Sequence, residues 1–276
     1  MVRRRLGRGH RRRRRGAGRR HAGGGRRRAV SPLSDCFGQA RADGRAVLIG
    51  YLPAGFPSVG GARAACLAMV QAGVDVVEVG LPYSDPLMDG PTIQQAVDAA
   101  RRQGVTIADV MGTVEAVAAT GAPTLVMTYW NPVERYGVER FARDLAAAGG
   151  AGVITPDLTP EEAGPWLAAT EAAELDPVFL VAPSSSDARV AAVAAVTRGF
   201  VYAASTMGVT GARERVSDVA ESLVDRVRAT SALPVAVGLG VSDGRQAAQV
   251  AAYADGVIVG SALVRRLLDA PDERSG

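Results

Sequence analysis

Eight short apolar runs occur along the chain from residue 46 onward, and longer helical patterns separate them. The runs are rich in valine and leucine, and they occupy residues 46–52, 74–80, 123–129, 151–156, 176–182, 199–205, 233–240 and 254–260. Alanine-rich helical stretches lie between them, at 60–72, 91–101, 139–148, 161–173, 187–197, 216–229 and 243–252. Strands that alternate with helices in this way predict βαβ units and a parallel sheet.

The number of these units favours a closed sheet. Eight strand–helix units within 276 residues are typical of an α/β protein with a (β/α)8 TIM barrel. An open doubly wound sheet is the competing arrangement, and the absence of a G-x-G-x-x-G motif after the first run disfavours it. We therefore predict a single barrel domain over residues 29–276, preceded by a distinct segment over residues 1–28.

The second run, VDVVEVG, holds a glutamate among valines. Side chains alternate along a barrel strand between the interior and the helix layer, so Val76 and Glu78 share one face while Val77 and Val79 share the other. Glu78 also lies near the C-terminal end of its run, where the active sites of this fold are found. Burial there raises the pKa of a carboxyl group toward values useful for proton transfer.

A structural glutamate is the alternative reading of this position. Glu78 would then pair with an interior arginine or turn toward solvent at the end of the strand. None of the eight runs contains an arginine, which weakens the pairing version. The following loop, LPYSDPLMDG, carries Asp85 and Asp89 over the same end of the predicted barrel, so we expect a group of carboxylates at its mouth.

Glycine-rich segments end three of the late runs. They are MGVTGAR at 207–213, VGLGVSDG at 237–244 and IVGSAL at 258–263. Loops after the last two barrel strands commonly bind phosphate, because glycines let backbone N–H groups approach the anion and a helix N-terminus adds favourable potential. Ser261 can cap this helix or donate to the phosphate. The alternative is that these glycines only make tight turns.

Two absences in the composition restrict the chemistry. The sequence contains no lysine, and both of its histidines, His10 and His21, lie within the first 28 residues. A Schiff base and a Walker-type phosphate lysine are therefore excluded. Ser-His-Asp and Cys-His catalysis are excluded from the barrel domain, and we expect no metal site built on histidine. The remaining candidates for proton transfer are carboxylates and hydroxyl groups.

Residues 1–28 form a basic arm that differs from the rest of the chain. They hold 14 of the 32 arginines and no acidic residue, which leaves 18 arginines and 28 acidic residues in the remainder. So many like charges with few apolar residues predict disorder. A polyanion-binding tail is one interpretation, and an extension without a role is the other. Because the arm has no aromatic residues for base stacking, we expect no nucleic-acid partner.

Two further features concern the location of the protein. No stretch approaches 18 consecutive apolar residues, so no membrane span is expected. Cys36 and Cys66 are the only cysteines, and they do not suggest a disulfide framework, so we predict a cytoplasmic protein from a reducing compartment.

The loop EVGLPYSDPLMDGPTIQ resembles the signature of the tryptophan synthase α subunit family. The resemblance continues, in order, through GYLPAGFPS (50–58), MTYWNPVERYG (127–137), YAASTMGVTGAR (202–213), VGLGVS (237–242) and VGSALV (259–264). It covers roughly residues 45–268. It implies a lyase that cleaves indole-3-glycerol phosphate to indole and glyceraldehyde 3-phosphate by a retro-aldol step, without a metal or a Schiff base.

The resemblance also assigns roles to individual residues. Glu78 matches the catalytic acid and base, and Asp89 matches the acid that binds the indole N–H and stabilises the positively charged intermediate. Residues that match substrate-binding positions are Tyr129, Tyr202 and Thr210, and residues that match phosphate-binding positions are Gly211, Gly240, Gly260 and Ser261. Thr210 belongs to a mobile loop in this family, 205–213 here, whose closure brings the threonine to the signature aspartate.

The family further implies a partner and a cofactor outside this chain. Its α subunit docks on a β subunit that uses pyridoxal phosphate, in an α2β2 complex, and indole passes between them through a tunnel. The matching contact regions are the loop after the second run, YWNPVERYG and TPDLTPEE. No cofactor is expected in this chain. A stand-alone lyase, a non-catalytic regulator or polyanion-binding barrel, and a different barrel lyase or isomerase remain the alternatives.

Two features depart from the family pattern. One is the arginine-rich arm. The other is the C-terminus at Gly276, where family members usually continue through another helix that packs on the barrel. Loss of that helix is expected to expose apolar surface.

Overall fold

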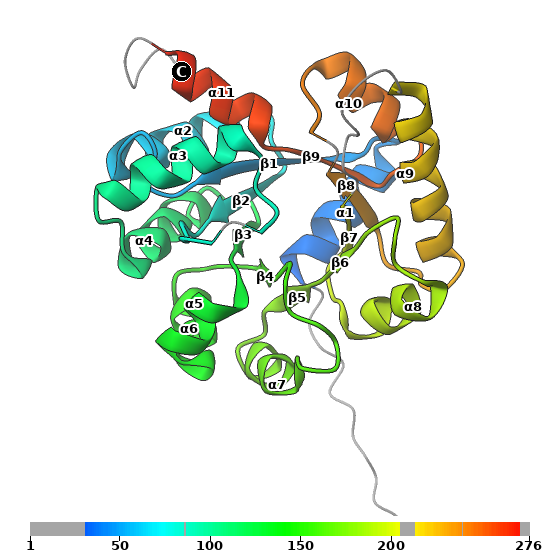
Figure 1. Ribbon diagram of the computed structural model, residues 1–276, viewed down its shortest axis with the longest axis horizontal. Helices are drawn as coiled ribbons and strands as arrows, with labels where there is room; N and C mark the ends of the chain where they lie inside the picture. The colour runs from blue at the N-terminus through cyan, green and yellow to red at the C-terminus, as the bar shows by residue number, and fades with distance from the viewer. Residues whose placement is uncertain (1–30, 86, 205–212, 239, 271–276) are drawn as a thin grey trace, which may run out of the picture.

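Nine short parallel strands form the centre of the described part of the chain. The computed structural model describes residues 31–85, 87–204, 213–238 and 240–270, with only the backbone of 213–217 (Figure 1). The strands are β1 Val47–Pro53, β2 Val76–Gly80, β3 Thr124–Met127, β4 Gly152–Ile154, β5 Asp176–Val178, β6 Leu180–Val181, β7 Val201–Ala204, β8 Val235–Gly238 and β9 Gly256–Val259.

The strands close into a barrel, as the alternating pattern predicts. Their order is β5-β4-β3-β2-β1-β9-β8-β7-β6, and the two edge strands follow each other directly in the chain. Val178 of β5 pairs with β4 and Leu180 of β6 pairs with β7, so the single run predicted at 176–182 changes partner at Phe179. The eight predicted runs thus form a (β/α)8 barrel, and the open-sheet alternative is wrong.

Helices surround the barrel on its outer side (Figure 1). The helices of the described residues are α1 Pro32–Ala42, α2 Val59–Gln71, α3 Pro91–Arg102, α4 Ile107–Ala118, α5 Trp130–Tyr136, α6 Val138–Ala147, α7 Gly164–Ala172, α8 Asp187–Val196, α9 Arg213–Arg228, α10 Gly244–Ala251 and α11 Ser261–Asp269. All seven predicted helical stretches are found. The helices α1, α4 and α5 were not predicted.

Local capping explains where several helices begin. The Ser58 side chain accepts a hydrogen bond from the Gly61 amide before α2, and Asp243 accepts one from the Gln246 amide before α10. Thr106 and Asp109 form a reciprocal capping box at the start of α4. Such caps satisfy amides that have no partner within the helix, and each contributes on the order of 1 kcal/mol.

The barrel interior has its own apolar core, which is closed at one end. Val76 belongs to the interior cluster, whereas Val77 and Val79 pack in the cluster between the sheet and the helices; the predicted alternation along this strand is therefore confirmed. Helix α1 covers the N-terminal end of the strands, where Phe37 lies against Phe200 with ring centroids 5.4 Å apart. The C-terminal end of the barrel remains available for a site.

None of the helices that the structure describes has the length and apolar character needed to cross a membrane.

Candidate functional site

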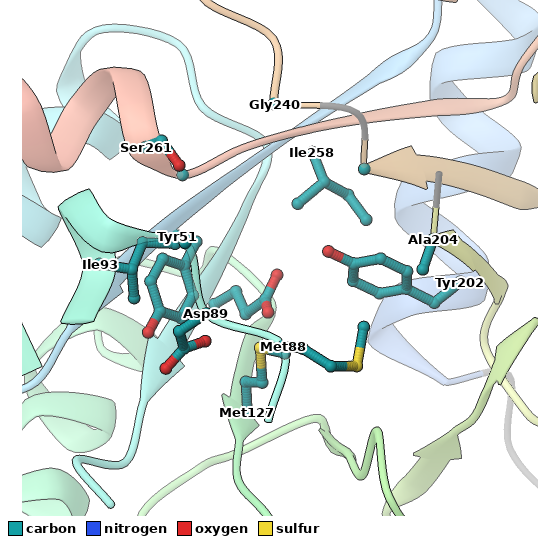
Figure 2. Close-up of a pocket in the computed structure, with 14 residues that line it drawn as sticks. Tyr51, Met88, Asp89, Ile93, Met127, Tyr202, Ala204, Gly240, Ile258 and Ser261 are labelled. Atoms are coloured by element: carbon teal, nitrogen blue, oxygen red, sulfur yellow. The ribbon is translucent and has the colours of Figure 1, made fainter. Parts of the chain in front are cut away.

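A cavity of about 310 Å³ opens at the C-terminal end of the barrel strands (Figure 2). Its walls come from β1, β2, β3, β7, β8 and β9, and from the loop and helix that follow β2. The volume suits a small molecule, and active sites of (β/α)8 barrels lie at this end of the strands. This cavity is therefore the candidate active site.

Most of the predicted site residues line this one cavity. The lining includes Glu78, Asp89, Tyr202, Gly240, Gly260 and Ser261. Thr210 and Gly211 fall within residues 205–212, which lie outside the described residues. Tyr129 is described but is not part of the cavity wall.

Glu78 is buried in the cavity wall at the middle position of β2, two residues before the end of the strand. Its side chain is 1% exposed, and neither carboxylate oxygen has a hydrogen-bond partner among the described residues. Burial, and then the nearby Asp89 carboxylate, raise the pKa of Glu78 from an ordinary 4.5 to about 8. The structural alternative had two versions, an ion pair with an arginine and a side chain turned toward solvent. The burial of Glu78 contradicts the second, and no ion pair with Glu78 is found in the described part of the chain. Glu78 is thus suited to hold and transfer a proton at neutral pH.

The raised pKa of Glu78 predicts that stability depends on pH. Between pH 4.5 and about 8, the folded protein keeps a proton that the unfolded chain has lost. The free energy of unfolding therefore falls as pH rises through this window, by at most about 1.4 kcal/mol per pH unit from this group. Glu78→Gln cannot ionise, so urea unfolding at a series of pH values should show that the variant lacks this decline.

The control for this measurement is Glu115→Gln on α4. Glu115 is exposed, and its replacement should leave the pH dependence of wild type in place. The free energy of unfolding of Glu78→Gln should rise relative to that of wild type as pH rises. Parallel stability curves for wild type and Glu78→Gln would mean that Glu78 has an ordinary pKa.

Asp89 reaches the cavity from the loop between β2 and α3. The loop is held at this point because Gln94 of α3 donates a hydrogen bond of 2.7 Å to the Asp89 carbonyl. Burial raises the pKa of the Asp89 carboxyl above its ordinary value. Asp85, which was expected over the same mouth, is exposed, accepts a hydrogen bond from Ser84 and does not line the cavity. The structure thus brings two carboxylates together, Glu78 and Asp89, where three acids were expected.

Tyr129 lies behind the loop that carries Asp89. Its hydroxyl accepts a hydrogen bond of 3.0 Å from the Met88 amide, and its ring packs against Tyr83 with centroids 5.6 Å apart. These two contacts hold the loop near both of its ends. Tyr129 therefore supports the position of Asp89, and the structure shows no contact of Tyr129 with the cavity.

The other end of the cavity is formed by glycines and a helix start. Gly240 has a φ of +64°, a conformation that glycine adopts without strain. Helix α11 begins at Ser261, and Gly260 is its N-cap without a side-chain hydrogen bond. The expectation that Ser261 caps this helix is wrong by one position, because Ser261 is the first helical residue. Its hydroxyl and the free amides of the first turn remain available to an anion.

Several lining residues were missed in the sequence. They are Tyr51, Met88, Ile93, Met127, Ala204 and Ile258. Four of them lie near the C-terminal ends of strands. These four could have been predicted from the interior-facing positions at the end of each apolar run. Met88 and Ile93 come from the loop and from α3, and no periodicity indicated that they turn toward the cavity. Together with Tyr202, these side chains give the carboxylates a mostly apolar surrounding. The hydroxyl groups of Tyr51 and Tyr202 are its polar part.

No group of three or more histidine, cysteine or acidic side chains that could hold a metal ion occurs among the residues with described positions.

The chain is similar to known proteins along most of its length. The family model described as "Tryptophan synthase alpha chain" matches residues 37–275. The tryptophan synthase alpha chain of Salinispora tropica is 62% identical over 247 residues, which are 90% of this chain and 92% of that protein. The alpha chain of Mycobacterium tuberculosis (strain ATCC 25177 / H37Ra) is 61% identical over 239 residues, with 87% and 88% coverage.

Solved structures agree with this similarity. The structure of Mycobacterium tuberculosis tryptophan synthase in space group F222 superposes with a TM-score of 0.83 at 59% identity, covering 87% of this chain and 93% of that chain. Tryptophan synthase subunit alpha from Legionella pneumophila str. Paris gives a TM-score of 0.81 at 31% identity, covering 90% of this chain and 93% of that chain.

Proposed function

Because this chain belongs to the tryptophan synthase alpha chain family, we propose that Glu78 and Asp89 are the two residues that carry its reaction. The chain is a lyase that cleaves indole-3-glycerol phosphate to indole and glyceraldehyde 3-phosphate. The observation that supports the two residues is their placement: both carboxyls line one cavity, and burial raises the pKa of each.

Glu78 supplies both proton transfers. With a pKa of about 8, it is protonated at neutral pH and donates its proton to C3 of the indole ring. The carboxylate that results then takes the proton of the hydroxyl on the attached glycerol carbon, while the bond between this carbon and C3 breaks. The electron pair of that bond returns to the ring, the glycerol carbon becomes the aldehyde, and Glu78 is again protonated.

Asp89 stabilises the intermediate between these steps. Protonation at C3 leaves a positive charge on the indole nitrogen, and an ionised carboxylate that accepts the N–H hydrogen bond lowers the energy of this state. Tyr202 contacts the substrate within the cavity. Thr210, which lies outside the described residues, is the further substrate-binding residue of this proposal. Tyr129, which was expected to bind the substrate, accepts a hydrogen bond from the Met88 amide in the Asp89 loop, and we propose that it acts by holding this loop.

The phosphate occupies the glycine end of the cavity. Gly240 and Gly260 leave room for backbone amides to approach the anion, and Ser261 with the start of α11 provides donors and favourable potential. Gly211, the fourth phosphate-binding residue of this proposal, lies outside the described residues. Because the carboxylates and the glycines lie at different parts of one cavity, a substrate with an indole at one end and a phosphate at the other fits between them.

The pH dependence of the reaction tests the role of Glu78. Glu78 must start protonated, so kcat/KM for glyceraldehyde 3-phosphate formation is expected to fall as pH rises through about 8. The assay uses this chain assembled with its β subunit, with a coupled dehydrogenase that reads the aldehyde product. A profile that stays level well above pH 8 would contradict the proposal that Glu78 is the proton donor.

The β subunit is the partner of this chain in an α2β2 complex, and indole passes to it for tryptophan synthesis. Pyridoxal phosphate belongs to that subunit, and the α chain carries no cofactor. The proposed docking face consists of the loop after β2, residues 129–137 and residues 155–162. Leu87 is 74% exposed, which favours a covering partner over a stand-alone lyase. The Trp130 amide donates to Asp157 at 2.9 Å, so α5 and the third segment are held together.

We propose a single barrel domain over residues 29–276 and a separate basic arm over residues 1–28 that takes no part in catalysis. The protein is located in the cytoplasm, which agrees with a biosynthetic enzyme whose two cysteines are free thiols.

A further inference from the structure

Tyr51 is a polar residue of the cavity wall that the reaction described above does not use. It lies on β1 directly opposite Glu78 of β2 in the strand register. Its side chain is 6% exposed and lines the cavity together with Glu78 and Asp89. A tyrosine is large enough to fill this position with its ring, and a phenylalanine would do so equally well, so the hydroxyl needs a separate explanation.

Two glycines fix the position of the Tyr51 ring. A Cβ atom built on Gly80, at the end of β2, would overlap the Tyr51 hydroxyl. A Cβ atom built on Gly260 would lie 3.1 Å from Cδ1 of the same ring. The ring is therefore confined between the end of β2 and the start of α11, and its hydroxyl cannot swing freely.

The hydroxyl of Tyr51 lies beside Asp89. Figure 2 shows the oxygen of Tyr51 and the carboxylate of Asp89 next to each other at one side of the cavity. The electrostatic effects on the two cavity tyrosines agree with this placement. Burial raises the pKa of both phenols well above its ordinary value. The second largest effect on the pKa of Tyr51 comes from Asp89, whereas the second largest effect on the pKa of Tyr202 comes from Glu78. Both phenols thus keep their protons and can act as neutral donors.

Asp89 needs such a donor to work as an anion. No described residue, Tyr51 included, donates a hydrogen bond to its carboxylate in this structure, and burial favours its neutral form. The described cavity wall contains no arginine, and its hydroxyl groups belong to Tyr51, Tyr202 and Ser261. Ser261 lies at the phosphate end, and among charged groups Glu78 has the largest effect on the pKa of Tyr202. Of the hydroxyl groups in the described wall, Tyr51 is therefore the one placed for Asp89, while Thr210 lies outside the described residues.

We propose that Tyr51 is a positioning residue whose hydroxyl donates a hydrogen bond to the ionised Asp89 carboxylate and directs it toward the indole N–H. This inference rests on the proposed role of Asp89. The bond favours the charged form of Asp89 without adding a positive charge, so the full attraction between Asp89 and the cationic indole intermediate is retained. Gly80 contributes by leaving space for the hydroxyl.

The test is the pH dependence of kcat/KM for aldehyde formation by the complex with the β subunit. Activity requires ionised Asp89, so the acid limb of the profile reports its pKa in the free enzyme. Tyr51→Phe removes only the hydroxyl and should move this limb to higher pH by about one unit, with the alkaline limb unchanged. Below the limb, kcat/KM of Tyr51→Phe should be about tenfold lower than that of wild type.

Two matched variants each remove one hydroxyl from another tyrosine. Among charged groups, Glu78 has the largest effect on the pKa of Tyr202. Tyr202→Phe should therefore move the alkaline limb and leave the acid limb in place. Tyr253 precedes β9 at the opposite end of the barrel. Tyr253→Phe should therefore move neither the acid limb nor the alkaline limb of the profile. Gly80→Ala displaces the Tyr51 hydroxyl without deleting it, and if it folds it should reproduce the acid-limb shift of Tyr51→Phe.

Distinct results would overturn the inference and the role on which it rests. An acid limb at the wild-type position in folded Tyr51→Phe, or an equal displacement of both limbs, overturns the inference about Tyr51. An acid limb that persists in Asp89→Asn shows that the limb does not belong to Asp89, which contradicts the proposed function itself. Thermal unfolding of each variant establishes that the compared proteins are folded.

Discussion

Replacing Glu78 by glutamine is expected to reduce the rate of aldehyde formation by about 10²–10⁴-fold, the range typical of general acid–base catalysis. Glutamine has nearly the same shape as glutamic acid, but it can neither give a proton to C3 nor take one from the hydroxyl. The barrel should be unaffected, because Glu78 has no ion pair or hydrogen bond among the described residues for the substitution to break. The measurement is steady-state formation of glyceraldehyde 3-phosphate by the complex with the β subunit.

The control for this loss is again Glu115→Gln, which makes the same chemical change on the exposed face of α4. It should retain the wild-type rate. A Glu78→Gln enzyme that is folded and keeps more than a small fraction of the wild-type rate would show that another group transfers the proton.

Replacing Asp89 by asparagine is expected to reduce kcat by roughly 10²–10³-fold, which is the usual effect of removing one group that stabilises a charged transition state. Asparagine can still accept a hydrogen bond from the indole N–H, but it carries no negative charge to balance the cation. The loss should therefore be larger in kcat than in the affinity for substrate. The measurement is kcat and KM of the variant in the complex with the β subunit.

Asp98→Asn on α3 is the matched control for Asp89→Asn. Asp98 is exposed and forms an ion pair of 3.6 Å with Arg101, and such surface pairs contribute little to stability. Its replacement should leave both kinetic constants unchanged. A loss confined to KM in Asp89→Asn would indicate that Asp89 binds substrate without stabilising the intermediate.

Regular features of the sequence were sufficient to predict the barrel. Each strand run is short, apolar and followed by a helical stretch, so the alternation could be read locally. The interior position of Glu78 followed from the two-residue period of a strand, because Val76 and Glu78 must point to the same side. The carboxylate pair could be predicted from position in the chain: Glu78 lies near the C-terminal end of its strand, and Asp89 lies on the loop that follows this strand.

Features that depend on tertiary contacts could not be read in this way. Helix α1 carries no signal that it closes the N-terminal end of the barrel, since this depends on Phe37 meeting Phe200, a residue far away in the sequence. The change of partner at Phe179 results from how the barrel closes and not from any residue pattern. The exposure of Asp85 also depends on the path of its loop, so the sequence could not show that this side chain lies outside the cavity.

The place of the tyrosines is a further example. Tyr129 and Tyr51 both lie in segments that resemble the family, but resemblance alone does not distinguish a side chain in the cavity wall from one behind a loop. Tyr129 proves to hold the Asp89 loop through the Met88 amide, whereas Tyr51, which had no assigned role, lines the cavity. Only the register of β1 with β2 places Tyr51 opposite Glu78.

Glu78 and Asp89 act together on one substrate in one cavity. The most direct test compares aldehyde formation by wild type, Glu78→Gln, Asp89→Asn and the double variant, each folded and in complex with the β subunit. Residues that act as a unit give strongly non-additive losses. We therefore expect the double variant to be about as slow as the slower single variant. Losses that multiply in the double variant, or a single variant with nearly the wild-type rate, would contradict this account.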